Sequence, residues 1–282
     1  MRADLHSHSN ASDGTCPPAE VMRRASAAGL DVIALTDHDT VAGHAAAKAA
    51  LPPGLTLVPG LELSCRRDGH SVHLLGYLFD PDDAELAQEC ERIRDSRVRR
   101  AEAMVRRLAE LGVPVTWEQV TAIAGGGVVG RPHVARAMVE AGVIESPDQA
   151  FSPEWIGAGG RAHVTRYALD PVRAVALIGA AGGVSVLAHP RAGRRGWMVP
   201  DEVIAGLAAA GLSGVEVWHP DQDHAQRMQL ADLAGRLGLV ASGGSDDHGE
   251  LTGYRIGSDT IAADACDRLL SPATGDVPVT GS

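Results

Sequence analysis

The sequence predicts an α/β fold in which strands and helices alternate along a single elaborated domain of 282 residues. Short apolar runs, such as residues 31–36 and 184–187, have the length of buried strands. Segments with apolar residues at helical spacing separate these runs. Polar residues follow the strands at the ends where α/β folds bind their ligands. We therefore expect one rim of the fold to carry the functional site.

The composition is that of a globular chain. Aromatic residues make up only 3% of it, while 33 glycines and 45% apolar residues favour closely packed helices and strands over disorder. The formal charge of −11 argues against a surface that coats duplex nucleic acid, because such binding needs many Lys and Arg contacts to phosphates. It leaves room for a local basic pocket.

The chain shows neither a thiolate motif nor a membrane signature. Its four cysteines are scattered and form no Cys-x-x-Cys pair, so reduced and mostly buried thiols are expected. No basic region followed by an apolar run opens the sequence, and no apolar stretch reaches membrane-spanning length. We expect a cytoplasmic protein without a membrane partner.

The first 80 residues are expected to form strands and helices in alternation. Asp4 to His8 is predicted to be a short strand that ends in polar residues. A helix over residues 17–28 follows, with two prolines in its first turn and Gly29 at its end. The next elements are a strand at 31–36, a helix at 44–50, a strand at 55–63 and, after the turn pair Asp68-Gly69, a strand at 71–79.

Residues 81–160 depart from this alternation and are predicted to form an inserted helical subdomain. A long charged segment at 81–111 has apolar residues at helical spacing. Shorter helices are expected at 117–124, 133–141 and 148–156, separated by glycine-rich joints. We expect the insertion to cap the site, whereas residues 1–80 and 161–282 form the main, discontinuous domain.

The alternation resumes after the insertion, and each strand again delivers polar residues to the same rim. The tail beyond Ser271 is polar and is expected to be frayed. The predicted elements are a helix at 170–181, a strand at 184–187, a helix from Pro200, a strand at 214–218, a helix at 223–237 and a strand at 239–242.

Histidines and carboxylates gather at the predicted strand ends. His6 and His8 project from the same face of the first strand, because side chains alternate along a strand, and they make half of a metal site. Asp13 lies in a turn that can fold its carboxylate back beside them. The remaining candidate ligands follow or end later strands: His38, Glu62, His73, His189, Asp246 and His248.

The joint placement of these residues favours a metal site over the structural role that a single histidine more often has. Imidazole together with carboxylate suits zinc, iron and manganese, and nothing here supplies soft thiolates. Nine candidate ligands exceed what one ion needs, and a carboxylate such as Glu62 can bridge two ions. The sequence therefore predicts a cofactor of two or three divalent metal ions.

The order of these motifs resembles the PHP (polymerase and histidinol phosphatase) family of metal-dependent phosphoesterases over nearly the whole chain. The matching motifs are His6-x-His8, Ser12-Asp13-Gly14, Leu35-Thr36-Asp37-His38-Asp39, Pro59-Gly60-x-Glu62, His73, Ala188-His189-Pro190 and Gly244-Ser245-Asp246-x-His248-Gly249. Two further motifs resemble the bacterial branch that removes the 3'-phosphate from 3',5'-bisphosphonucleosides: Gly130-Arg131-Pro132-His133 and Trp218-His219-Pro220-Asp221.

The resemblance implies a distorted (β/α)7 barrel that holds a trinuclear metal site. Some family members carry His where this chain has Asp13, so the number and identity of the ions stay open. The implied ligand sets are His6, His8, Glu62 and Asp246 for one ion, Glu62, His73 and His189 for a second, and Asp13, His38 and His248 for a third.

The chemistry expected at such a site is hydrolysis of a phosphomonoester by a hydroxide that bridges two ions, because coordination lowers the pKa of water to near neutrality. Glu62 would bridge the ions, and Asp246 would orient the hydroxide or accept its proton. His219 would contact the substrate or the leaving oxygen. Arginines add bidentate contacts to phosphate, so the candidate substrate-binding residues are Arg131, His133, Arg191 and Arg194.

Three functions remain open at this point. The first is a phosphatase that converts 3',5'-bisphosphonucleosides to 5'-monophosphates, with short oligoribonucleotide ends as further substrates. The second is a phosphatase or cyclic phosphodiesterase for a non-nucleotide metabolite such as histidinol phosphate. The third is a non-catalytic metal-binding or nucleotide-binding module, which would be expected to lack ligands, whereas all nine are present. The motif around Arg131 favours the first function.

Overall fold

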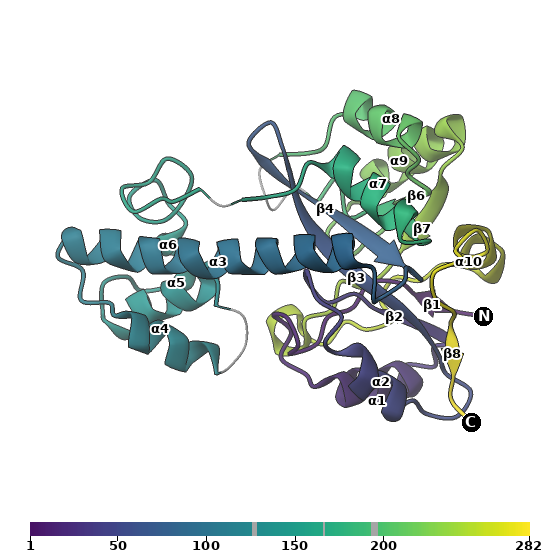
Figure 1. The fold of residues 1–282 in the computed structure, drawn as a ribbon, viewed down its shortest axis with the longest axis horizontal. Coiled ribbons are helices and arrows are strands. Elements are labelled where there is room, and N and C mark those ends of the chain that lie inside the picture. The colour runs from purple at the N-terminus through teal and green to yellow at the C-terminus, as the bar shows by residue number, and fades with distance from the viewer. Residues whose placement is uncertain (126–128, 166, 193–196) are drawn as a thin grey trace. The chain divides into compact units, whose positions relative to one another are not determined.

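The structure is a computed structural model of residues 1–282, and it describes all of them except 126–128, 166 and 193–196. The described chain separates into two compact units (Figure 1). Unit 1 comprises Met1–Cys90 and Ala168–Ser282, and unit 2 comprises Glu91–Tyr167. No helix in the described part of the chain is long and apolar enough to cross a membrane.

Unit 1 is built on one sheet whose first seven strands are neighbours in chain order. All neighbouring pairs run parallel except that β4 is antiparallel to both β3 and β5. The Leu5 N–H donates to the Gly243 carbonyl at 3.3 Å, so the first strand approaches the last one. The strands are β1 (Ala3–Asp4), β2 (Val32–Leu35), β3 (Thr56–Arg67), β4 (His70–Tyr77), β5 (Val184–Leu187), β6 (Gly214–Trp218), β7 (Val240–Gly243) and β8 (Val279–Thr280).

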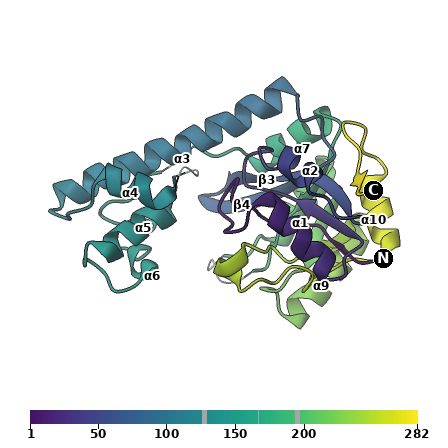
Figure 2. The same cartoon turned by 90° about the horizontal axis from the view of Figure 1, so that it is seen from below.

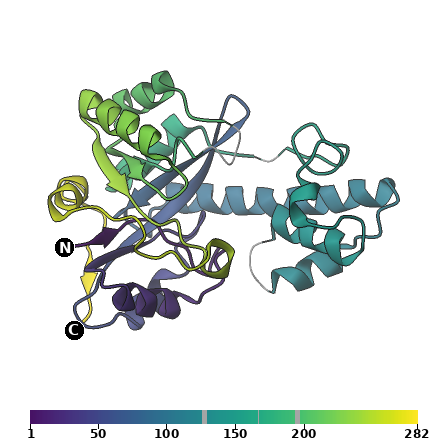
Figure 3. The same ribbon diagram turned by 180° about the vertical axis from the view of Figure 1, so that it is seen from behind.

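This arrangement is the distorted, nearly closed (β/α)7 barrel that the family resemblance implies. Its helices lie outside the sheet (Figures 2 and 3). Helices α1 and α2 pack beside β2 and β3, whereas α7 and α9 pack on the strands from β4 to β7. The helices are α1 (Pro18–Ala27), α2 (His44–Ala49), α7 (Pro171–Ala180), α8 (Asp201–Ala209), α9 (His224–Leu237) and α10 (Ala263–Leu270), with a 3-10 turn, η2 (Gly249–Thr252).

Strand β2 divides the core of unit 1 into an inner and an outer layer. Val32 and Ala34 pack among the apolar side chains of the sheet interior. Ile33 and Leu35 pack instead with the buried face of α1. This alternation follows from the two-residue repeat of a strand, and it leaves the end of β2 pointing at the rim. The register of the sheet thus carries each motif to the same rim.

Unit 2 is helical and has its own apolar core. That core includes Met104, Leu108, Val120 and Met138, all fully buried. Helix α4 begins with a capping box in which the Thr116 hydroxyl accepts the backbone N–H three residues on. Its helices are α3 (Ala84–Glu110), which begins in unit 1, and α4 (Trp117–Ala124), α5 (Arg131–Glu140) and α6 (Pro147–Ala150).

Three expectations about local structure are wrong. The strand predicted from Asp4 to His8 ends at Asp4 as β1, so His6 and His8 lie in the loop after it. The helix predicted at 148–156 ends as α6 at Ala150, because the chain turns there and the Ile156 N–H returns to the Ala150 carbonyl. The tail beyond Ser271 is ordered, since β8 pairs antiparallel with β3, placing Thr280 opposite Thr56. The Thr274 N–H also donates to the Gly182 carbonyl at 2.7 Å. The polar composition of the tail gave no sign of these backbone hydrogen bonds, so the sequence did not predict them.

Candidate metal centre

Eight of the nine candidate ligands converge at the rim of unit 1 in three overlapping groups, and the ninth, His189, reaches Glu62 from outside them. Within each group the ligand atoms, one from each residue, lie within 4.8 Å of one another. His8, His38 and Glu62 each belong to two groups, so the three groups form one continuous cluster. Among the described residues the groups are His6, His8, Glu62 and Asp246; His8, Asp13, His38 and His248; and His38, Glu62 and His73.

Glu62, on β3 and only 1% exposed, occupies the middle of the cluster. Its Oε2 atom lies 3.3 Å from His6 Nε2 and 3.1 Å from His8 Nε2. Its Oε1 atom lies 2.6 Å from His73 Nδ1 and 3.1 Å from His189 Nε2. One carboxylate therefore offers an oxygen to each of two neighbouring sets of imidazoles, which is the geometry that a bridging ligand requires.

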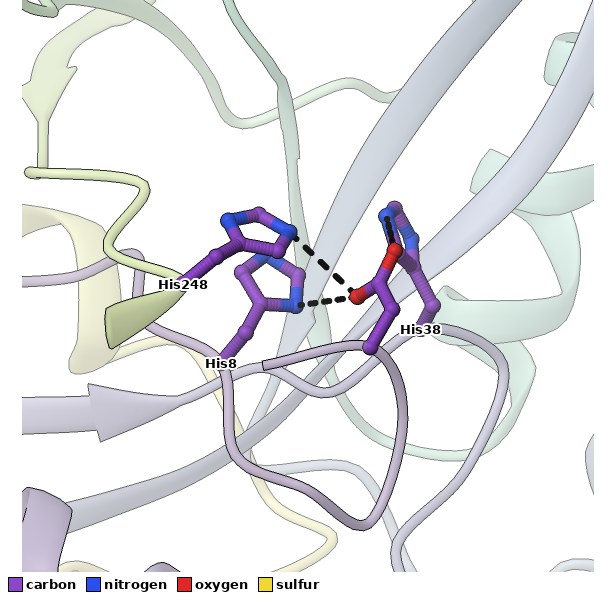
Figure 4. A group of neighbouring side chains, drawn as sticks. His8, His38 and His248 are labelled. Carbon is purple, nitrogen blue, oxygen red and sulfur yellow. Dashed lines mark ion pairs between the residues drawn. The ribbon is translucent and has the colours of Figure 1, made fainter. Parts of the chain in front are cut away.

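A second part of the cluster surrounds the carboxylate of Asp13 (Figure 4). Asp13 Oδ1 lies 3.3 Å from His248 Nε2 and 3.9 Å from His8 Nδ1, and Oδ2 lies 3.8 Å from His38 Nε2. The Asp13 side chain is 41% exposed, whereas the other ligand side chains are buried or nearly so. This part of the cluster is the one open to solvent.

Asp246, a member of the first group, follows β7 and faces its two histidines. Its Oδ1 atom lies 3.3 Å from the Nε2 atoms of both His6 and His8. Its Oδ2 atom lies 3.3 Å from His219 Nε2. His219 Nδ1 accepts the Asp221 N–H at 3.1 Å, so the ring proton of a neutral His219 sits on Nε2 and points at Asp246.

The charges within the cluster depend on one another. Burial would raise the pKa of Glu62, but His38, His73 and His6 hold it well below the ordinary value. Burial would lower the pKa of His8, but the carboxylates of Asp246 and Glu62 raise it to about 10. Burial does prevail at His38, and it lowers that pKa to about 3 despite Glu62 and Asp13. The carboxylates are thus ionised and available to cations.

The donor set fits divalent metal ions. Nδ1 of His8 and Nδ1 of His38 are buried and make no hydrogen bond to the described residues. Buried polar atoms nearly always make hydrogen bonds, so imidazole nitrogens that make none, yet lie near ionised carboxylates, fit the role of metal ligands. Imidazole nitrogen and carboxylate oxygen suit manganese, iron and zinc.

A set of buried carboxylates supports the ligand-bearing loops, and the sequence reading missed them. Asp4 accepts the N–H groups of Ser245 at 2.9 Å and Gly257 at 2.8 Å, and burial raises its pKa to about 6. Asp247 accepts the Arg255 N–H at 2.7 Å. Glu216 on β6 is the fully buried carboxylate nearest to the ring of His6. Charged residues inside apolar strands are the sequence signal that marks such groups.

The predicted substrate-binding residues lie in both units. Arg191, in unit 1, pairs its guanidinium with Asp201 and the Val199 carbonyl. Arg131 begins α5 in unit 2 and stacks over Phe151 at 5.2 Å. The site residues that remain are His133, whose Nδ1 accepts the Gly130 N–H at 3.0 Å, and Arg194, which lies outside the described residues.

Comparison with known proteins places this geometry among phosphoesterases. The PHP domain matches residues 4–115. A 5'-3' exoribonuclease of Haemophilus influenzae is 36% identical over 247 residues, covering 87% of this chain and 89% of the relative. A 3',5'-nucleoside bisphosphate phosphatase of Chromobacterium violaceum is 34% identical over 254 residues and 89% of each chain.

A solved structure agrees with these relatives. The Bifidobacterium adolescentis protein, which carries the provisional name of a metal-dependent phosphoesterase, superimposes with a TM-score of 0.86 at 33% identity over 96% of each chain. The rim cluster, the barrel and these similarities together establish that the chain belongs to the PHP domain family and is a phosphoester hydrolase of its metal-dependent class.

Proposed function

We propose that the protein removes the 3'-phosphate from 3',5'-bisphosphonucleosides to give 5'-monophosphates, and that it also acts on the ends of short oligoribonucleotides. The observation that supports this most directly is the position of Glu62, whose two oxygens face different sets of imidazoles. A carboxylate in this position would help to hold two adjacent ions, which would together stabilise the charge on a single phosphoryl group. The names of the two bacterial relatives supply the nucleotide class.

The ligand sets proposed for the ions combine the rim residues as the family resemblance implies. Bound there, manganese, iron or zinc ions supply an activated water and neutralise charge on the phosphoryl oxygens. His38 has two possible roles, because its ring nitrogens approach both Asp13 and Glu62. The proposed sets are His6, His8, Glu62 and Asp246; Glu62, His73 and His189; and Asp13, His38 and His248.

Asp246 is the proposed proton acceptor, and His219 is proposed to contact it and the substrate. Asp246 is ionised, because His6 and its other imidazole neighbours outweigh burial and keep its pKa well below the ordinary value. Its carboxylate can therefore accept a proton from the attacking water. In its neutral form His219 has one ring proton, on Nε2 and 3.3 Å from Asp246 Oδ2, so we propose that it donates a hydrogen bond to Asp246 or to the leaving oxygen of the substrate.

The substrate contacts are proposed to come from Arg131, His133, Arg191 and Arg194. Arg131 and His133 lie in unit 2 and are proposed to bind a phosphate of the substrate. To contact a phosphate, Arg191 would have to exchange its present partners, Asp201 and the Val199 carbonyl. Arg131 is the first residue to test, because its motif resembles the bisphosphonucleoside branch and it begins α5.

The experiment that tests the function is phosphate release by the manganese-loaded protein from 3',5'-adenosine bisphosphate. The comparison substrates are 5'-AMP, 3'-AMP, histidinol phosphate, a cyclic phosphodiester and a short 5'-phosphorylated oligoribonucleotide. Fastest turnover of the bisphosphate, with 5'-AMP as the product, supports the proposal. Faster turnover of histidinol phosphate or of the cyclic ester would replace the nucleotide with a metabolite, and no turnover of any substrate would favour a binding module.

Arg131→Ala tests the contribution of unit 2. We expect kcat/KM for the bisphosphate to fall about tenfold or more, since a charge-assisted hydrogen bond to phosphate is lost. Arg136→Ala is the matched control, because Arg136 lies on the same helix, is largely exposed and pairs only loosely with Glu140 at 3.9 Å. Equal kinetics for the two variants would remove Arg131 from the site.

A further inference from the structure

Glu216 is a buried carboxylate inside an otherwise apolar strand. It lies on β6 between Val215 and Val217, and none of its side chain is exposed. Neither of its oxygens belongs to a metal-ligand group among the described residues. Burying a carboxylate costs several kcal/mol unless its oxygens are paired, so the partners of Glu216 reveal what it does.

Both oxygens of Glu216 hold residues of the rim cluster. Oε1 lies 3.0 Å from His6 Nδ1, and Oε2 accepts the backbone N–H of His189 at 2.7 Å. His189 has a φ of +32°, a conformation that residues other than glycine rarely adopt. The carboxylate therefore ties the imidazole that follows β1 to a strained backbone position that follows β5.

The direction of the His6 ring follows from this contact. A carboxylate only accepts hydrogen bonds, so the proton of a neutral His6 sits on Nδ1. Its Nε2 atom then presents a lone pair toward Glu62 and Asp246, each 3.3 Å away. A histidine that binds a metal through one nitrogen usually donates its other N–H to such an acceptor.

We propose that Glu216 is a positioning residue that fixes the tautomer of His6 and the backbone of His189, so that one carboxylate orients ligands for two neighbouring ions. The proposal rests on the metal-dependent function proposed above. Glu216 is not a proton-transfer group, because both of its oxygens are occupied and no part of it reaches solvent.

Glu216→Gln tests the tautomer with almost no change of shape. The backbone N–H of His189 can only donate, so the amide oxygen of the variant pairs with it, and the amide NH2 group faces His6 Nδ1. That nitrogen must then accept, which moves the ring proton of His6 to Nε2, the atom that faces Glu62 and Asp246. We expect manganese and zinc to bind about 10- to 100-fold more weakly, measured by equilibrium dialysis with elemental analysis.

Glu216→Ala distinguishes positioning from simple packing. Alanine leaves a larger cavity, so the metal-free Ala variant should melt at a lower temperature than the Gln variant. It offers no donor to His6, however, so His6 can keep its proton on Nδ1, and the Ala variant should bind zinc more tightly than the Gln variant. If Glu216 had only a structural role, the Gln variant should have both the higher melting temperature and the higher zinc affinity of the two.

The zinc-loaded wild-type protein offers a direct spectroscopic readout. We expect a slowly exchanging Nδ1–H resonance from His6 in the wild type, and its loss in Glu216→Gln. The control is Glu202→Gln, an exposed acid in the first turn of α8, which should leave both affinity and resonance unchanged. Wild-type zinc affinity together with an unchanged resonance in Glu216→Gln overturns the proposal. These readouts are independent of turnover, so a wrong substrate assignment would appear only in the phosphate-release assay.

Discussion

At the scale of single residues, Asp246 combines an unusual backbone conformation with a central place among the imidazoles. Its φ is +49°, a region in which Asp and Asn are the non-glycine residues most often found. Asp246→Asn should therefore keep the fold and remove only the charge. We expect kcat for phosphate release to fall on the order of 100- to 10,000-fold, the usual range for loss of a general base, with circular dichroism unchanged.

Asp247 is the natural comparison for that variant. Its carboxylate accepts the Gly249 N–H at 3.1 Å and the Thr252 hydroxyl at 3.0 Å, so it supports the loop and does not face the imidazoles. Asp247→Asn should lower the melting temperature more than Asp246→Asn does. Full turnover in Asp246→Asn would show that another group accepts the proton.

His44 gives a residue-level prediction about pH. Its Nε2 donates to the Gly60 carbonyl at 2.7 Å, and burial lowers its pKa below the ordinary value for histidine. As the pH falls below about 6.5, His44 becomes protonated in the unfolded chain but stays neutral in the folded chain. The free energy of unfolding therefore decreases. His44→Gln can keep the bond to Gly60 and removes this titration.

The measurement is urea unfolding of metal-free wild type and His44→Gln at pH 7.5 and pH 5. We expect the wild type to lose more unfolding free energy than the variant over this interval. An equal loss in both proteins would mean that His44 becomes protonated in the folded state without cost.

At the scale of elements, the loop after β1 depends on one carboxylate for its shape. Asp37 accepts the Ser9 N–H at 2.8 Å, the Ser9 hydroxyl at 2.7 Å and the Ser12 hydroxyl at 2.6 Å. These bonds fold the loop so that Asp13 returns beside His248. The motif that includes Asp37 therefore positions a candidate ligand on a neighbouring loop.

Asp37→Asn should weaken metal binding by the group that contains Asp13. The amide replaces an acceptor with a donor that faces the Ser9 hydroxyl, and we expect a loss of about 1–3 kcal/mol of stability. Ser12→Ala removes only one of the three bonds and should have a smaller effect on both melting temperature and metal content. Metal content in Asp37→Asn equal to that of the wild type would separate the loop from the metal centre.

The elements also show how far sequence reasoning reaches. Strand ends were predictable because a short apolar run such as 31–36 indicates a buried strand. The polar motif after it then indicates the rim. The pairing of β8 with β3 was not predictable, because it joins Thr280 to Thr56 across the chain and periodicity reports only local burial. Glu216 was missed for a related reason, since its partner His6 lies 210 residues away.

At the scale of the whole molecule, the candidate ligands all belong to unit 1, although they span the chain from His6 to His248. Ions bound there would connect the middle of β3, where Glu62 lies, with the loops that follow β1, β5 and β7. A ligand that binds only the folded state adds RT ln(1 + [L]/Kd) to the free energy of unfolding, about 2.7 kcal/mol at a hundred times Kd. We expect manganese to raise the melting temperature and a chelator to reverse the increase.

The same reasoning predicts where the stabilisation appears. Unit 2 has its own apolar core around residues such as Leu108 and Met138, and none of the nine candidate ligands. Hydrogen exchange with and without manganese should therefore show added protection in peptides from 1–90 and 168–282, with little change in 91–167. Equal added protection in both units would mean that they unfold as one cooperative body. The division of the chain would then describe its packing and not its stability.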